Sequence, residues 1–147
     1  MSCTRKSPGL RSTTLRTLAR EALLLAGRSH AAASIVLTDD ETIRALNRDF
    51  REVDRPTDVL SFPLAEPGDL RDPDAAVFLG EIYISLETAH AQALSARRPF
   101  PREVAHLTVH GLLHLLGYDH HTAAARRRMV TLERRMMWAL RGRIAEL

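Results

Sequence analysis

The most informative stretch of this sequence is HGLLHLLGYDH, residues 110–120. His110 and His114 are four residues apart, which on a helix means about 400° of rotation and a rise of about 6 Å, so both imidazoles project from one face. On a continued helix His120 would point elsewhere, but Gly117 favours the left-handed conformation with which many helices end. The pattern therefore predicts a helix that stops at Gly117 and a chain that turns back, so that all three histidines hold one metal ion.

Three neutral imidazoles with no nearby cysteine favour Zn2+, with nickel and copper as alternatives. Three protein ligands leave a fourth position open, which is typical of a catalytic site. Zinc in such a site lowers the pKa of a bound water to about 7. His106, one turn before His110, is expected to pack or to support the ligands, and Asp119 is expected to orient an imidazole.

Metalloproteases with the motif HExxHxxGxxH share this histidine spacing, and there the glutamate is the general base. Gly111 stands at that position here and has no side chain. A protease would therefore lack its proton acceptor, which favours a hydrolase whose metal activates the nucleophile.

Composition is typical of a folded protein with a real core. The chain has 147 residues, 45% of them hydrophobic, and we expect a single domain spanning residues 1–147. Cys3 is the only cysteine, so no intrachain disulfide can form. The sequence contains no apolar run of 18 residues and no signal-peptide pattern, so a cytoplasmic protein without a membrane span is expected.

Periodicity predicts strands at 34–37, 57–62 and 79–85 and helices over about 15–26, 40–50, 86–98, 101–116 and 123–138. Residues 38–41 read as a capping box, Ile43, Leu46 and Phe50 as the apolar stripe that follows it, and Thr122 as a helix cap. Residues 64–77 form a long loop of the kind that is often functional or mobile. We therefore expect an α+β fold in which a small mixed β-sheet of three or four strands packs against about five helices, with the metal site at the end of a buried helix.

The formal net charge is +3, and Lys6 is the only lysine among 21 basic residues. The arginine excess is explained by a GC-rich genome or by phosphate recognition, since arginine offers bidentate donors. A cluster of arginines in the last helix is expected to form its solvated face: Arg126, Arg127, Arg128, Arg134 and Arg135.

Three blocks in this order resemble the YbeY family of bacterial rRNA maturation factors and endoribonucleases. Residues 110–120 fit the family signature HGxLHLxGYDH, and DRPTDVLSFP at 54–63 and LGEIYIS at 79–85 resemble two further blocks. The similarity extends from about Ser34 to Trp138. It implies one zinc ion on His110, His114 and His120 and cleavage of single-stranded RNA. It also implies a role in 16S rRNA 3′-end maturation and ribosome quality control, with the small ribosomal subunit and its assembly factors as partners and no DNA.

The resemblance also implies site residues, so Arg51, Glu81 and His114 are the candidate catalytic residues. Arg51 matches the family's functional arginine, and an arginine can neutralise charge that builds on a phosphate. Glu81 stands where the family usually has aspartate, and it is either a proton acceptor or a partner of Arg51. Family members usually begin with a further strand, which residues 1–10 do not clearly show.

Two other functions remain open from sequence. One is a metalloprotease, which Gly111 and the basic balance oppose. The other is a non-catalytic ribosome assembly factor with a structural metal, which the open fourth coordination position opposes.

Overall fold

A three-stranded sheet lies at the centre of the computed structural model, which describes residues 10–147. The strand order is β1 (Ala32–Thr38), β3 (Phe78–Ser85), β2 (Val59–Pro63). β1 runs parallel to β3 and β2 runs antiparallel to it, so the sheet is mixed, as predicted. The question of a further N-terminal strand, and Cys3, fall on residues 1–9, which lie outside the described part of the chain.

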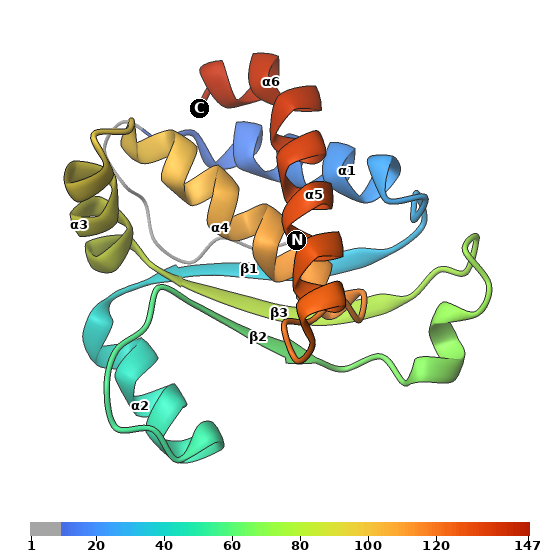
Figure 1. The fold of residues 1–147 in the computed structure, drawn as a ribbon, viewed down its shortest axis with the longest axis horizontal. Coiled ribbons are helices and arrows are strands. Elements are labelled where there is room, and N and C mark those ends of the chain that lie inside the picture. Colours follow the sequence, from blue (N-terminus) through green and yellow to red (C-terminus); the bar gives the residue numbers. More distant parts are fainter. Residues whose placement is uncertain (1–9) are drawn as a thin grey trace.

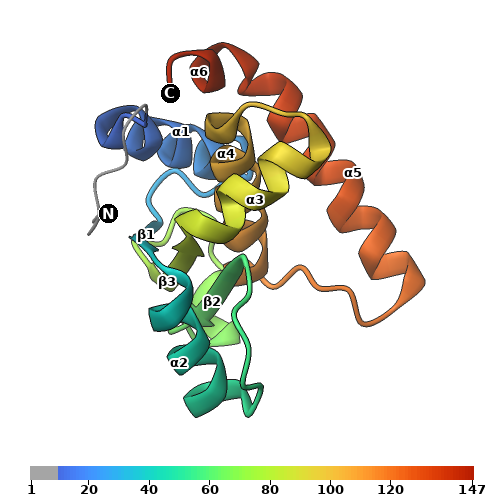
Figure 2. The same ribbon diagram turned by 90° about the vertical axis from the view of Figure 1, so that its left-hand side faces the viewer.

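Six α-helices accompany the sheet in residues 10–147 and confirm the predicted α+β class. They are α1 (Ser12–Leu25), α2 (Asp40–Arg51), α3 (Leu86–Ala96), α4 (Phe100–Leu115), α5 (Ala123–Ala139) and α6 (Arg141–Ala145). Figures 1 and 2 show α1, α3 and α4 on one side of the sheet and α2 on the other. The prediction of about five helices missed the break at Leu140, after which α6 begins.

The buried helix α4 organises the core. It contacts β2 and β3 as well as α1, α3, α5 and α6. Gly111 of α4 lies against Ile82. Ile82 and Ile84 are fully buried and alternate with the part-exposed Glu81 and Tyr83 along β3. Since successive side chains of a strand point to opposite faces, α4 covers the Ile82 face of the sheet.

Helix caps follow the sequence with one correction. Thr122 Oγ1 accepts the Ala125 N–H at 3.0 Å, as predicted for the start of α5. At α2 the cap is Asp39, whose carboxylate accepts the Thr42 N–H at 2.8 Å, and not the Thr38–Glu41 capping box. An aspartate caps a helix as well as a threonine does, and the cap lies one residue later than the capping box predicted.

Phe50 is a second correction. It was predicted to lie in the apolar stripe of α2, yet it is 68% exposed, and Asn47 is buried instead. The Asn47 side chain donates to the carbonyl oxygen of Arg55 at 2.9 Å, which satisfies the buried amide and holds the α2–β2 connection.

The connection between β2 and β3 is anchored to the rest of the fold. It contains a short 3₁₀ helix, η1 (Pro67–Leu70). The Arg28 guanidinium donates to the carbonyl oxygens of Leu70 at 2.7 Å and Asp72 at 3.2 Å. Residues 64–77 are therefore hydrogen-bonded to the turn that follows α1. These bonds restrain a loop of a kind that is often mobile. Within residues 10–147, no helix is long and apolar enough to cross a membrane.

Candidate metal centre

The turn after α4 has the geometry predicted from the sequence. Gly117 has a φ of +101°, the left-handed region that favours glycine. Its N–H donates to His114 O at 3.0 Å, and the Tyr118 N–H donates to Leu113 O at 3.1 Å. This pair of bonds is a Schellman motif, which ends the helix and reverses the chain.

The reversal brings His120 back to the face of α4 that carries His110 and His114. One ring nitrogen from each of the three histidines lies within 4.8 Å of the others. The Nε2 atoms of His114 and His120 are 3.1 Å apart. Two nitrogens that each lie about 2.1 Å from a tetrahedral ion are about 3.4 Å apart, so the donor set fits one metal ion.

A carboxylate on α5 orients the first of these histidines. Glu133 is only 9% exposed and hydrogen-bonds to Nδ1 of His110, which leaves Nε2 of that ring for a metal. Its other oxygen lies 3.2 Å from His106 Nε2. A carboxylate behind a ligating histidine fixes the ring orientation and raises its basicity.

The role of Glu133 was not predicted from the sequence, although its position on α5 was a signal for it. It lies with Met129 and Met136 on the buried side of α5, and a carboxylate at a core position needs a partner. The role expected of Asp119 is not seen: Asp119 Oδ1 accepts the backbone N–H of His121 at 3.0 Å. Glu133 occupies the supporting position instead.

The pKa values of His114 and Glu133 suit a site that binds a metal ion. Burial, followed by the charges of His110, His120 and Arg51, lowers the pKa of His114 to about 4, so His114 is neutral at pH 7. Burial alone would raise the pKa of Glu133, but hydrogen bonds with His106 and His110 outweigh it and lower the pKa to about 2. The same bond to Glu133 raises the pKa of His106.

Replacing Glu133 with glutamine tests this support. We expect the metal affinity to fall by about 10- to 100-fold, because losing a partner behind a ligand has that effect in other metal sites. Competitive titration with a chromophoric chelator measures the affinity. Glu146→Gln, at an exposed glutamate of the C-terminal segment, is the control and should bind metal like the wild type. Equal affinities for both variants would remove Glu133 from the site.

Replacing Gly117 with valine tests the turn. A side chain at a positive φ costs about 1–2 kcal/mol of stability, and a displaced His120 should also weaken metal binding. No atom lies within 4 Å of a Cβ built at Gly117, so the cost comes from the backbone alone. Gly142→Ala, where a Cβ also meets nothing and φ is not positive, is the control. Urea unfolding of both variants measures the cost in stability. A Gly117→Val protein with the wild-type unfolding midpoint would contradict the left-handed turn.

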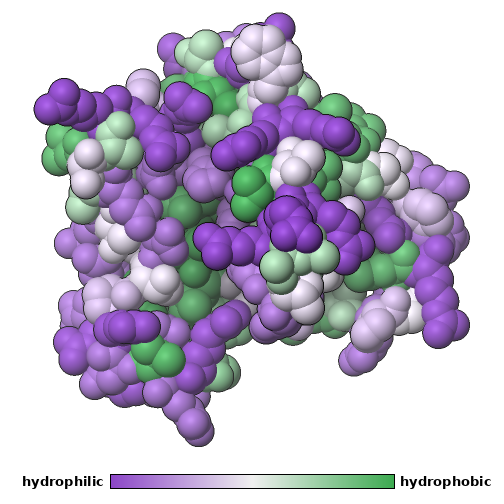
Figure 3. Space-filling view, in the orientation of Figure 1, coloured by the Kyte–Doolittle hydropathy of each residue, from purple (hydrophilic) through white to green (hydrophobic). Residues whose placement is uncertain are grey.

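Arg51 reaches the same cleft from another part of the chain. It is the last residue of α2, and Glu52 follows with a left-handed φ of 59° that ends the helix. The guanidinium Nη2 donates to the Ser61 carbonyl at 3.0 Å. A cleft of about 160 Å³ is lined by six residues: Arg51, Val59, Ser61, Pro63, His110 and His114. Figure 3 shows a hollow on this face of the molecule, between the part that contains α5 and the side that carries α2 and α3.

Glu81 does not join this cluster. It alternates with Ile82, so its side chain lies on the sheet face opposite α4, and it does not line the cleft. Its carboxylate accepts the hydroxyl of Tyr83 at 2.8 Å, and this bond raises the pKa of Tyr83. The described contacts of Glu81 support neither of the two roles expected of it.

The packing of α4 on β3 explains why position 111 is a glycine and not a general-base glutamate. A Cβ at this position would lie 2.7 Å from Cγ2 of Ile82, so α4 and β3 approach too closely for a side chain there. Position 111 faces the sheet and not the cleft. A glutamate at 111 would therefore be buried against Ile82 rather than placed beside a metal.

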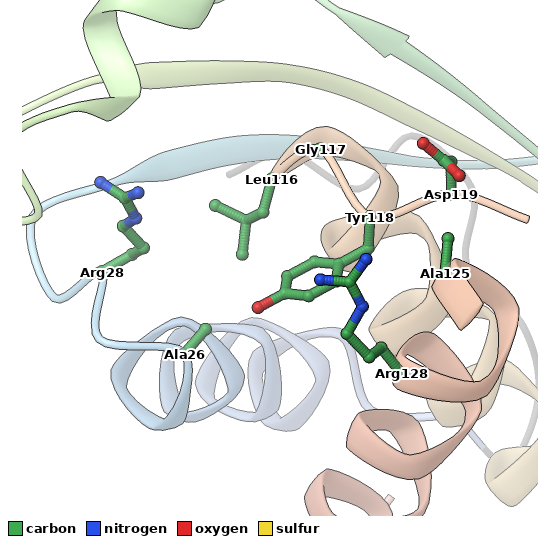
Figure 4. A pocket seen from close by; sticks show the side chains of 8 residues that line it. All are labelled: Ala26, Arg28, Leu116, Gly117, Tyr118, Asp119, Ala125 and Arg128. Carbon is green, nitrogen blue, oxygen red and sulfur yellow. The ribbon is translucent and has the colours of Figure 1, made fainter. Parts of the chain in front are cut away.

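A separate cavity lies behind the turn that carries His120. It measures about 280 Å³, and Figure 4 shows its lining residues, which come from the end of α1, the turn at 116–119 and α5. Arg28, which anchors the β2–β3 connection, is one of them. None of the three histidines lines this cavity, so it is not part of the metal centre.

The fold and the site together define a class: small α+β proteins with three converging histidines that can hold a metal ion beside an arginine-lined cleft. The family model described as Endoribonuclease YbeY matches residues 3–141. The chain therefore belongs to the YbeY family.

Curated relatives that match the chain are named Endoribonuclease YbeY. The protein from Nitrobacter hamburgensis is 45% identical over 108 residues, which are 73% of this chain and 57% of the relative. One from an Anaeromyxobacter strain is 49% identical over 119 residues, 81% of this chain and 59% of the relative. The chain thus spans less than two thirds of the length of these two relatives.

A relative from Rhodopseudomonas palustris is 40% identical over 143 residues, 94% of this chain and 73% of the relative. The fold is also similar to the solution structure of a Thermotoga maritima protein, with a TM-score of 0.61 and 26% identity. That match covers 99% of this chain and 94% of the other.

Proposed function

We propose that this chain is a zinc-dependent endoribonuclease that cleaves single-stranded RNA. One observation carries the proposal: Arg51 lines a single cleft with His110 and His114. Family membership supports ribonuclease activity, and an arginine beside metal-ligating histidines suits a phosphodiester substrate.

His110, His114 and His120 would hold the ion. Zinc, when bound, supplies a Lewis acid and activates water at neutral pH. The three imidazoles provide nitrogen donors only, which suits zinc and leaves nickel and copper as alternatives. Glu133 keeps the His110 ring oriented, and the low pKa of His114 keeps that ring free of a competing proton at pH 7.

Arg51 would bind the scissile phosphate. A guanidinium has five N–H donors, and the described contacts use one of them, on the Ser61 carbonyl. That bond fixes the side chain at the mouth of the cleft, while the remaining donors can hold phosphate oxygens and stabilise the charge that grows on them during cleavage. Glu81 takes no part in this proposed chemistry, because it lies on the other face of the sheet.

The proposed biological substrate is the 3′ region of 16S rRNA, with a further role in ribosome quality control. The partners would then be the small ribosomal subunit and its assembly factors in the cytoplasm, and DNA would not be a substrate. The relatives' printed name supports RNA as the substrate class.

The test is cleavage of end-labelled single-stranded RNA by protein that has been stripped with a chelator and reloaded with zinc, nickel or copper. We expect cleavage of single-stranded but not duplex RNA, restored best by zinc. Casein is the control substrate and should stay intact. Cleavage of casein would favour a protease, and no cleavage of either substrate by metal-loaded protein would favour an assembly factor.

A further inference from the structure

A second large groove lies beside the metal centre, between the start of α4 and the helices α5 and α6. It measures about 880 Å³. Its floor is apolar, with Val130, Met137 and Ile144 among the lining residues. Figure 2 shows α6 and the C-terminal end of α5 near the start of α4, where this groove is formed.

Four arginines line the groove: Arg98, Arg102, Arg134 and Arg141. All four are exposed, and within residues 10–147 none of them forms an ion pair with a carboxylate. Glu133 is the only acidic side chain among the lining residues, and it is engaged by His106 and His110. The groove therefore carries more positive than negative charge around its apolar residues.

Trp138 stands at the edge of this groove and is 68% exposed. Its position is held by Arg141, whose Nη1 donates to the Trp138 carbonyl at 2.8 Å. The same guanidinium lies 4.0 Å from the centre of the indole ring. A large aromatic ring that stays exposed in this way offers a surface on which another flat group can stack.

The groove borders the metal centre through two of its lining residues. His106 and Glu133 line the groove, and Glu133 bonds to the metal-site residue His110 on its other side. The rings of His106 and His110 are 6.3 Å apart, centre to centre. Figure 3 shows hydrophilic side chains crowded over α5 on this face of the molecule. A chain lying in the groove would thus pass close to His110, on the other side of Glu133.

We propose that this groove binds the nucleotides that flank the scissile phosphate of a single-stranded RNA, with a base stacked on Trp138 and phosphates held by Arg98, Arg102 and Arg134. The inference rests on the proposed function for its substrate class. Stacking on an aromatic ring together with arginine–phosphate contacts is how proteins hold single strands without reading their sequence. A duplex offers no free base face to Trp138, so the groove also contributes to single-strand preference.

The first experiment uses the native fluorescence of the protein, because Trp138 is its only tryptophan. The metal-loaded protein is titrated with a single-stranded oligoribonucleotide whose phosphorothioate linkages slow its cleavage. We expect saturable quenching of Trp138. An abasic oligomer of equal length should bind without that quenching, because it has phosphates but no bases. Equal quenching by both oligomers, or binding seen by anisotropy without any quenching, would overturn the proposal.

Variants separate stacking from charge. Trp138→Leu keeps the apolar bulk but removes the aromatic ring, and it should weaken RNA binding about tenfold. Trp138→Phe keeps an aromatic ring and should retain most of the wild-type affinity. Arg102→Ala and Arg134→Ala should each reduce the slope of log affinity against log salt by about 0.7. Arg16→Ala, at an exposed arginine of α1 outside the groove, is the matched control and should leave the slope unchanged. Wild-type affinity and slope in the groove variants would refute the assignment.

Failure of this inference and failure of the proposed function give different results. RNA cleavage without Trp138 quenching would retain the nuclease and discard the groove. Quenching without cleavage would retain the groove and discard the nuclease. Quenching by a glutamate-rich peptide at the same concentrations as by RNA would assign the groove to an acidic protein segment and overturn the proposal.

Discussion

Replacing His114 with alanine is expected to remove the metal and the RNA cleavage together. His114 sits between the other two ligands, with its Nε2 3.1 Å from that of His120, so its loss leaves two donors for the ion. A catalytic metal contributes several kcal/mol to the transition state, so cleavage should fall on the order of 10³-fold or more. Elemental analysis and single-turnover cleavage of single-stranded RNA measure the two effects.

The control for this prediction is His121→Ala. His121 is exposed, adjoins the third ligand and is not part of the three-histidine group, so its loss should change neither quantity. Circular dichroism of both variants checks that the fold is kept. Stoichiometric zinc in the His114→Ala protein would refute the assignment of this histidine.

Replacing Arg51 with alanine is expected to depress cleavage while leaving the metal in place. Arg51 lines the cleft but is not a ligand, so zinc content and fold should be those of the wild type. Loss of one contact to a charge in the transition state costs on the order of 10²–10³ in rate. Arg51→Lys should recover only part of the activity, because a point charge cannot make the bidentate phosphate contact.

Arg48→Ala is the matched control for Arg51→Ala. Arg48 lies on the same helix, is exposed, pairs with Asp49 and does not line the cleft. Its removal should leave single-turnover cleavage near the wild-type rate at saturating zinc. A wild-type rate for Arg51→Ala would exclude this arginine from the chemistry.

Local interactions explain what could be predicted from the sequence. The spacing of His110 and His114 and the stop at Gly117 involve neighbours within about two helical turns, where the geometry follows from the backbone alone. The helix and strand patterns likewise depend on nearby residues, and they were enough for the α+β class and the mixed sheet. Two local details departed from expectation. Aspartate and threonine both cap helices well, so the cap at Asp39 could not be told from one at Thr38, and the exposure of Phe50 depends on packing beyond its own helix.

Long-range packing explains what could not be predicted. Glu133 lies 23 residues beyond His110 and reaches it only because α5 packs against α4. Glu81 resembles a site residue in its sequence block, but the alternation of β3 and the position of α4 place it on the opposite face of the sheet. The alternation of Glu81 and Tyr83 with Ile82 and Ile84 is visible in the sequence, but only the packing of α4 on the Ile82 face shows which face carries the histidines.

The sequence alone therefore determined the helix that carries His110 and His114, its stop at Gly117 and the convergence of the three histidines. These features depend on backbone geometry over a few residues. The resemblance had already named Arg51 as a site residue, and the structure places it in their cleft. The tertiary structure alone decided that Glu133 supports His110 and that Trp138 and four arginines line one groove. These groups come from α2, α5, α6 and the region around the start of α4. They meet only because burial of the apolar faces of α4 and the sheet brings distant segments together.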